Sequence, residues 1–293
     1  MVNVIDFFKY LAPWEFSPTV LVVTMAFLAA YLRGLYKSHV SGVRVGFWHP
    51  LGFLVGVLSI YAALQTYFDY LSQHMFWVHR VQHLLLHHAG PFLIALSAPG
   101  EILALGAPRW IARLLRPLVA NPVIQIIYRT VQRPAVASLL FVGLIYFWLT
   151  PSIHFYAMLS APLYKAMNWS MAIDGLLFWW LIVGPERAGS PVRVGYGTRM
   201  IMLVAVALPQ AVLGAYITFH HSALYDVYNL CGRAWPISPR IDQQLGGLNT
   251  WIPPGMMSAL GLVIVASRWM ESDVRVKPGA VTAPAVTVPV PAP

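Results

Sequence analysis

The sequence predicts an all-α membrane protein, a bundle of seven transmembrane helices, and two observations carry this prediction. Hydrophobic residues make up 58% of the 293-residue chain and charged residues only 10%, with a mean hydropathy of +0.65. Soluble domains contain about 25% charged residues. Apolar stretches also recur along the chain, each near the roughly 20 residues that a helix needs to cross the hydrocarbon core. We therefore expect a polytopic membrane protein.

The first two spans follow an amino-terminal segment of mixed character. Residues 1–18 combine aromatic and charged side chains and lack the short apolar core of a cleavable signal, so we expect an interfacial segment. The membrane domain is expected over residues 19–268, and it begins with spans at 19–36 and 50–68.

The third span, residues 74–98, is longer than one crossing requires and is interrupted by Gly90 and Pro91. Proline removes a helical hydrogen bond, so we expect a bend there. A basic connection follows, in which residues 110–119 have the pattern of an amphipathic helix on the membrane surface.

Four more spans complete the predicted bundle. A loop is expected at 151–165 and a longer polar loop at 220–250, and Pro253 and Pro254 suit the first turn of the last helix. Residues 269–293 are rich in Pro, Ala and Val, which predicts an extended, disordered tail. The four spans are expected at 135–150, 169–184, 200–219 and 251–267.

The distribution of basic residues predicts the orientation. The formal charge is +9, and most Arg and Lys side chains fall in connections on one side of the predicted bundle. By the positive-inside rule that side is cytoplasmic, which places the amino terminus outside and the carboxy-terminal tail in the cytoplasm. In so apolar a chain this charge favours contact with membrane lipid, and the sequence contains no nucleic-acid-binding motif. The connection after the third span alone carries Arg109, Arg113, Arg116, Arg129 and Arg133.

Five histidines lie within the third span, where hydrocarbon makes polar groups costly. His79, His83 and His87 are four residues apart and therefore follow one face of a helix. Polar side chains at this depth usually face the bundle interior and mark a functional site. The predicted topology gathers further candidate ligands at the same outer side, namely His74, Met75, Asp69, His154, His220, His221 and Asp242.

These residue types favour a metal site built from imidazole, thioether and carboxylate. A single cysteine, Cys231, excludes an intrachain disulfide framework, a thiolate zinc cluster and an iron–sulfur centre. Imidazole is a good copper ligand, and thioether suits Cu(I). Paired histidines can also simply hydrogen-bond to neighbouring helices, and the pattern leaves open whether His87, His88, His154 or Cys231 contribute ligands. Arg80 is expected to reach toward the outer interface.

Two other functions fit the same residues. A b-type haem could be held by two imidazoles from different helices, such as His83 and His220. A proton or metal transporter could use Asp174 and Gln210 together with the histidine face. A retinal protein is disfavoured, because the last span contains no lysine for a Schiff base.

Three motifs point to a family. The run HRVQHLLL at residues 79–86, with Pro91 and Ala98-Pro99 after it, resembles the third-helix motif of the bacterial cytochrome c oxidase assembly factor family called CtaG. The run DQQLGG at 242–247, followed by Trp251, resembles the signature before the seventh helix of that family. LFWW at 177–180, followed by Gly184-Pro185-Glu186, resembles its fifth helix, and the likeness extends from about Phe47 to Arg268.

The resemblance implies a multi-pass protein of the bacterial plasma membrane that helps to build an active haem–copper oxidase. It implies a metallochaperone that delivers copper to a nascent cytochrome c oxidase subunit and catalyses no reaction, while a homodimer is left open. The positions that match the family are His79, His83 and the Asp242 motif. Many relatives carry a Glu-His pair early in the fifth helix, where this chain has Asn168-Trp169, and this chain adds His74, His87 and His88.

Overall fold

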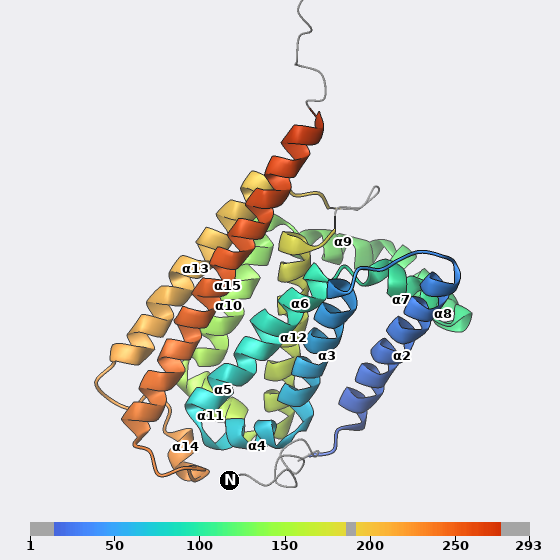
Figure 1. Ribbon diagram of the computed structural model, residues 1–293. Coiled ribbons are helices and arrows are strands. Elements are labelled where there is room, and N and C mark those ends of the chain that lie inside the picture. Colours follow the sequence, from blue (N-terminus) through green and yellow to red (C-terminus); the bar gives the residue numbers. More distant parts are fainter. Residues whose placement is uncertain (1–14, 186–191, 277–293) are drawn as a thin grey trace, which may run out of the picture.

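The computed structural model describes residues 15–185 and 192–276 and confirms the predicted class, a helical membrane bundle (Figure 1). Five helices are long and apolar enough to cross a membrane, and the number rises to seven if each of two bent helix pairs counts as one span. Most of the expected interfacial segment 1–18 lies outside the described residues. Which end of the bundle faces outside stays a prediction.

The first two spans form as expected, but the second ends earlier. α2 (Pro18–Val40) and α3 (Trp48–Gln65) correspond to the spans predicted at 19–36 and 50–68. Thr66 is extended, and its hydroxyl oxygen accepts the N–H of Phe68, which starts the separate helix α4 (Tyr67–His74). The last residues of the predicted second span therefore belong to α4.

The third span is divided into three pieces. Met75 is extended and separates α4 from the next helix. The bend expected at Gly90 and Pro91 is taken up by a π-helical turn before them, in which the N–H of Gly90 reaches the carbonyl of Leu85. Proline lacks an N–H and crowds the carbonyl four residues before it, and a wider turn accommodates both effects. The pieces are α5 (Phe76–His83), the π-helix η1 (Leu84–Ala89) and α6 (Gly90–Leu96).

Short helices fill the basic connection. α7 (Gly100–Gly106) turns away from the third span by 76°. The surface helix predicted at 110–119 is present as α8 (Arg109–Ala120), whose side chains are not buried. α9 (Pro122–Val131), which the sequence pattern did not indicate, precedes the fourth span, α10 (Pro134–Leu149), and makes an angle of 74° with it.

The prediction of a loop at 151–165 is wrong. α11 (Pro151–Leu159) occupies most of it, and α12 (Ala161–Val183) begins eight residues before the fifth span predicted at 169–184. Both helices carry proline in their first turn, a position that needs no backbone N–H, so these prolines start helices here. The sixth span is α13 (Tyr196–Phe219).

The last helix also begins earlier than predicted. α14 (Val227–Leu230) and the start of α15 (Pro239–Val276) lie within the segment 220–250 that we expected to be a loop. Pro253 and Pro254 consequently lie inside α15 and not in its first turn. α15 continues to Val276, beyond the expected domain boundary at residue 268, and the rest of the predicted tail lies outside the described residues.

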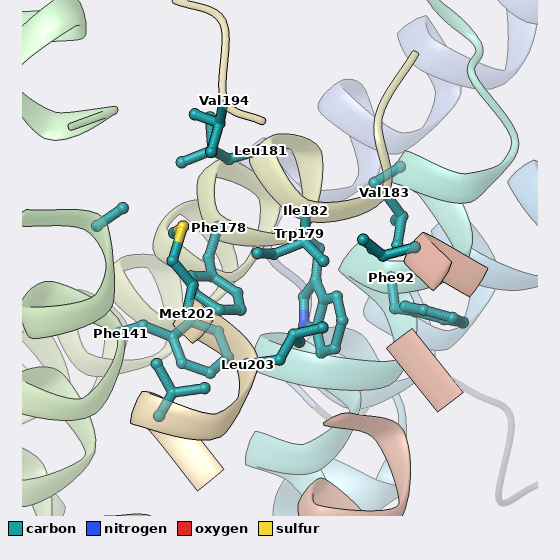
Figure 2. Packing of buried hydrophobic residues seen from close by; sticks show 14 residues of the cluster. Phe92, Phe141, Phe178, Trp179, Leu181, Ile182, Val183, Val194, Met202 and Leu203 are labelled. Atoms are coloured by element: carbon teal, nitrogen blue, oxygen red, sulfur yellow. The ribbon is translucent and has the colours of Figure 1, made fainter. Parts of the chain in front are cut away.

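The helices group into two ends. α4, α11 and α14 lie at one end of the bundle, which we call the α14 end, and α7, α8 and α9 lie at the other, the α8 end (Figure 1). α13 and α15 run side by side along the bundle (Figure 1). Aromatic side chains fill the core between α10, α12 and α13, where the rings of Phe141 and Phe178 stack at 3.9 Å beside the buried Trp179 (Figure 2). All predicted outer connections meet at the α14 end.

Candidate functional site

His79 is the centre of a group of three buried imidazoles near the α14 end. It lies in the first turn of α5 and is fully buried. Neither of its ring nitrogens makes a hydrogen bond of normal geometry, although the backbone of Ser72 lies near the ring. Its ring centroid lies 4.4 Å from that of His83 and 5.1 Å from that of His154. Buried polar side chains almost always have a partner, so an imidazole with none requires an explanation.

His154 comes to this group from α11. Its Nδ1 lies 3.1 Å from the carbonyl oxygen of Trp148, and a carbonyl can only accept, so Nδ1 carries the proton. Nε2 therefore has the lone pair, which accepts the hydroxyl proton of Tyr228 at 3.0 Å. Its position on the outer side was predicted, but its complete burial was not, because the surrounding helix was expected to be a loop.

Two side chains hold His83 in the tautomer opposite to that of His154. The Nη1 of Arg80 lies 3.4 Å from its Nδ1, and since a guanidinium only donates, Nδ1 accepts. Nε2 then donates to Oδ1 of Asn168 at 3.2 Å. Asn168, on α12, therefore holds an imidazole. Arg80 is buried and also donates to Thr250 at 3.0 Å, so the expectation that it reaches the outer interface is wrong.

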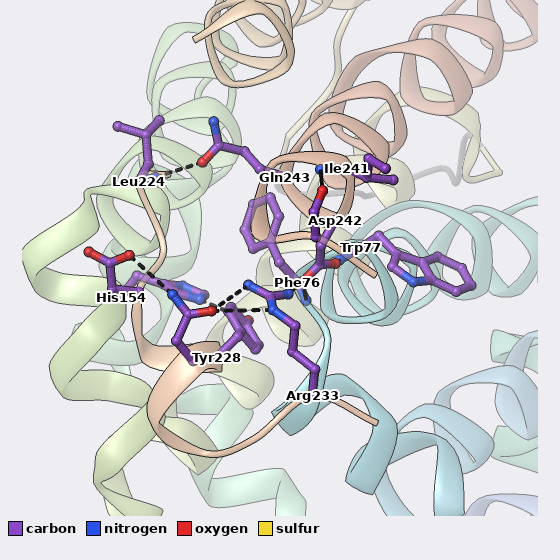
Figure 3. Close-up of polar contacts among 12 residues, drawn as sticks. Phe76, Trp77, His154, Leu224, Tyr228, Arg233, Ile241, Asp242 and Gln243 are labelled. Atoms are coloured by element: carbon purple, nitrogen blue, oxygen red, sulfur yellow. Dashed lines mark hydrogen bonds and ion pairs between the residues drawn. The ribbon is translucent and has the colours of Figure 1, made fainter. Parts of the chain in front are cut away.

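Asp242 fixes the start of the helix that carries His79 (Figure 3). Its carboxylate accepts the backbone N–H groups of Phe76 at 3.1 Å and Trp77 at 2.9 Å, and it also pairs with Arg233. Met75, at the N-cap of α5, gives no side-chain cap, so α15 supplies one. We expected Asp242 to bind metal or orient an imidazole. Both of its oxygens are instead engaged at the start of α5, which makes it a positioning residue.

The glycines of the same motif allow close approach, as expected. A Cβ on Gly246 would collide with the ring of Phe76, in the first turn of α5. A Cβ on Gly247 would lie 2.6 Å from the backbone nitrogen of Thr218, in the last turn of α13. α15 therefore packs against both helices through positions without side chains.

The remaining predicted ligands do not join the His79 group. His74 is half-buried, and its Nδ1 contacts the carbonyl oxygen of Tyr70 at 2.8 Å. His220 follows the end of α13 with its Nδ1 3.0 Å from the carbonyl oxygen of Ser222, and His221 is exposed. His83 and His220, the pair considered for the alternative b-type haem, both contact other groups. Cys231 is an exposed free thiol.

A second polar group lies deeper in the bundle on the π-helical turn. His87 Nε2 contacts Asp174 Oδ2 at 3.0 Å, and His88 Nε2 contacts Gln210 Nε2 at 3.1 Å. Both histidines are buried and keep an unpartnered Nδ1. Both of these adjacent histidines lie in the wide turn and are buried. Asp174, which we considered together with the histidine face, thus contacts an imidazole.

Asp69 joins α4 to α5 and α12, a role that the sequence did not reveal. Its carboxylate accepts hydrogen bonds from Gln82 and Tyr164, each at 2.7 Å, and from Gln73 at 3.0 Å. Burial raises the pKa of Asp69 to about 6, although these three hydrogen bonds act in the opposite direction. The hydrogen bond to Asp69 fixes the side chain of Gln82, which lies between His79 and His83 in the sequence of α5.

Within residues 15–185 and 192–276, no three His, Cys, Asp or Glu side chains are placed to hold a metal ion as they stand. The hydrogen bonds of the three imidazoles explain in part why they are not arranged as metal ligands. Within the group of His79, His83 and His154, the lone pair of His154 is occupied by Tyr228 and that of His83 by Arg80, so His79 is the member with a free donor atom.

A family model described as "Cytochrome c oxidase caa3 assembly factor" (Caa3_CtaG) matches residues 29–272. The chain belongs to this family. No curated protein and no solved structure matches the chain. Membership, together with the apolar helices, makes the chain a multi-pass membrane assembly factor for cytochrome c oxidase, and it confirms the resemblance that the three motifs indicated.

Proposed function

We propose that this assembly factor binds copper as Cu(I) at the group formed by His79, His83 and His154 and passes it to a nascent oxidase subunit. The observation that carries the proposal is His79, fully buried with two unpartnered ring nitrogens. Leaving a buried polar group without a partner costs about 1–3 kcal/mol, and an incoming ion would offset this cost.

The chemistry of the donors suits a transferable copper ion. All three side chains are imidazoles, which are good copper ligands, and Met75 is a buried thioether four residues before His79. The proton on Nδ1 of His154 faces a carbonyl, so this ring presents Nε2 to a metal once the Tyr228 hydroxyl turns away. The guanidinium of Arg80 next to His83 opposes a second positive charge, which favours a site that releases its ion.

The location of the group is consistent with delivery from outside the cell. It lies near the α14 end, where all connections that the positive-inside rule assigns to the outer face meet (Figure 1). We propose that the chain acts in the bacterial plasma membrane, exchanges its ion at that face and catalyses no reaction. Its partner is an oxidase subunit whose copper site is still empty.

Metal analysis of the purified chain tests the proposal. The detergent-solubilised protein is incubated with Cu(I) under reducing conditions, freed of loose copper and analysed for bound metal. We expect the wild type to retain copper and His79→Ala to lose at least about tenfold in affinity, which corresponds to about 1.4 kcal/mol. His49→Ala is the matched control, because His49 is exposed at the start of α3 and far from the group in sequence.

A cellular experiment tests the delivery step. A strain without the native gene is complemented with the wild type, His79→Ala or His49→Ala, and assembled oxidase is measured by its copper content and activity. We expect the wild type and His49→Ala to restore the oxidase and His79→Ala to fail. A wild-type protein without copper, or a His79→Ala variant that both binds copper and restores the oxidase, contradicts the proposal. An optical spectrum of the same preparation shows whether haem is bound instead.

A further inference from the structure

The proposed copper group is closed to solvent, so an ion needs a route to it. His79 is 0% exposed and His83 is 1% exposed. A pocket of about 220 Å³ lies at the α14 end, between the start of α11 and the chain around α14. We call it the access pocket, and its lining includes Ser152, His154, Tyr225 and Asp226.

His154 connects the access pocket to the copper group. It is one of the residues that line the pocket, its side chain is fully buried, and its ring centroid is 5.1 Å from that of His79. The Nε2 lone pair of His154 is covered only by the hydroxyl of Tyr228, a partner that α14 carries. A movement of the Tyr228 side chain alone would therefore free Nε2 of His154 to bind an ion.

Asp226 provides negative charge at the pocket. Its side chain is exposed, and its contact with another side chain is a long hydrogen bond of 3.4 Å from Nδ2 of Asn229. It forms no ion pair with a basic side chain in the part of the chain that the structure describes, unlike Asp242, which is paired with Arg233. An exposed carboxylate without a counter-ion at a narrow opening raises the local concentration of cations.

We propose that the access pocket is the site at which the chain acquires and releases its cation. Asp226 attracts the ion, His154 takes it when the Tyr228 hydroxyl turns away, and His79 receives it. The step is a ligand exchange: the metal–nitrogen bond replaces the hydrogen bond to Nε2, and Nδ1 of His154 keeps its proton. The ion is transferred without change of oxidation state. This inference rests on the proposed copper function. It adds the path of the ion and the residues that control the rate of copper loading and release.

The test follows the rate of copper loading of the full chain in nanodiscs after rapid mixing with Cu(I). We expect Asp226→Asn to slow loading several-fold at low ionic strength while the amount of copper bound at saturating copper stays the same, because steering acts on the association rate. Raising the salt concentration is expected to remove the difference. Asp226→Glu is expected to restore the rate, and Glu271→Gln, at an exposed acidic residue on α15, is the control.

A blocked pocket gives a second, independent variant. Ser152→Trp fills the pocket, and we expect it to slow loading and release together by at least about tenfold while the copper affinity is unchanged. If Ser152→Trp does not fold, Ser152→Cys in a Cys231→Ser background is labelled after folding with a bulky thiol reagent that cannot cross membranes. Loading at the wild-type rate in both the Asp226→Asn and the blocked protein overturns the access pocket. A wild-type protein that holds no copper at equilibrium instead overturns the copper function itself.

Discussion

The carboxylate of Asp242, in the first turn of α15, accepts a hydrogen bond of 2.9 Å from the backbone N–H of Trp77, in the first turn of α5. A side chain far along the sequence thus caps the helix that carries His79. The cap determines where α5 starts and therefore which way its imidazoles face.

Removing this cap is expected to loosen the histidine group. Asp242→Ala leaves the N–H groups of Phe76 and Trp77 and the guanidinium of Arg233 without their acceptor. We expect a loss of about 2–4 kcal/mol in stability, because a charged cap and a largely buried ion pair disappear together. Thermal unfolding in detergent measures it, with Glu271→Gln as the control, and copper affinity should fall in parallel. An Asp242→Ala protein with wild-type stability contradicts this role.

Gln210 completes the hydrogen bonding of α15 around its prolines. Pro254 has no N–H to bond the carbonyl of Thr250, four residues before it, and Nε2 of Gln210 donates to that carbonyl at 3.0 Å. Gln210→Leu should destabilise the protein by about 1–3 kcal/mol, since a buried carbonyl loses its donor. Gln125→Leu is the matched control, because that exposed side chain also donates to a carbonyl, at 3.1 Å. Equal melting temperatures for the two variants would count against this explanation.

Close packing at Gly246 predicts a strong effect of one methyl group. Gly246→Ala places a Cβ against the ring of Phe76, and α15 must shift away from α5. Overpacking of this kind typically costs about 1–3 kcal/mol, and the shift should also weaken copper binding. Gly255→Ala, on the same helix with no atom within 4 Å of the added Cβ, should be neutral or stabilising. Similar losses of stability in both variants would show that the contact with Phe76 is not responsible.

The raised pKa of Asp69 predicts that the stability of the protein falls as the pH rises from about 4 to 6. Burial raises its pKa to about 6 from the ordinary 3.8, so the folded chain holds this proton more tightly than the unfolded chain does. The resulting stability is fully present below about pH 4, is lost as the pH rises toward 6, and changes little above that. Asp69→Asn cannot titrate and should lack this decline. Melting temperatures of both proteins between about pH 4 and 7 test the prediction, and parallel curves would refute it.

The spans and the histidine face could be predicted from the sequence because both depend on local patterns. Backbone groups in hydrocarbon must bond within their own segment, so apolar stretches of sufficient length become helices wherever they pack. The spacing of His79 and His83 on one face depends in the same way on helix geometry alone.

The tertiary structure decided what the sequence pattern did not. Residues 151–165 and 239–250 contain Pro, Ser, Gly and Asn, which are typical of turns. In the structure the prolines lie in the first turns of α11 and α12 and at the start of α15, positions that need no backbone N–H. Which lone pairs stay free depends on partners such as Trp148, Tyr228 and Arg80. Tyr228 is distant from His154 in the sequence, and the other two reach their rings only in the folded geometry of α11 and α5. Hydrophobic periodicity depends on near neighbours along the chain. The protonation and accessibility of an imidazole depend instead on the side chains and carbonyls that surround it in the folded bundle. For that reason only the folded structure shows that His79 keeps its ring nitrogens free.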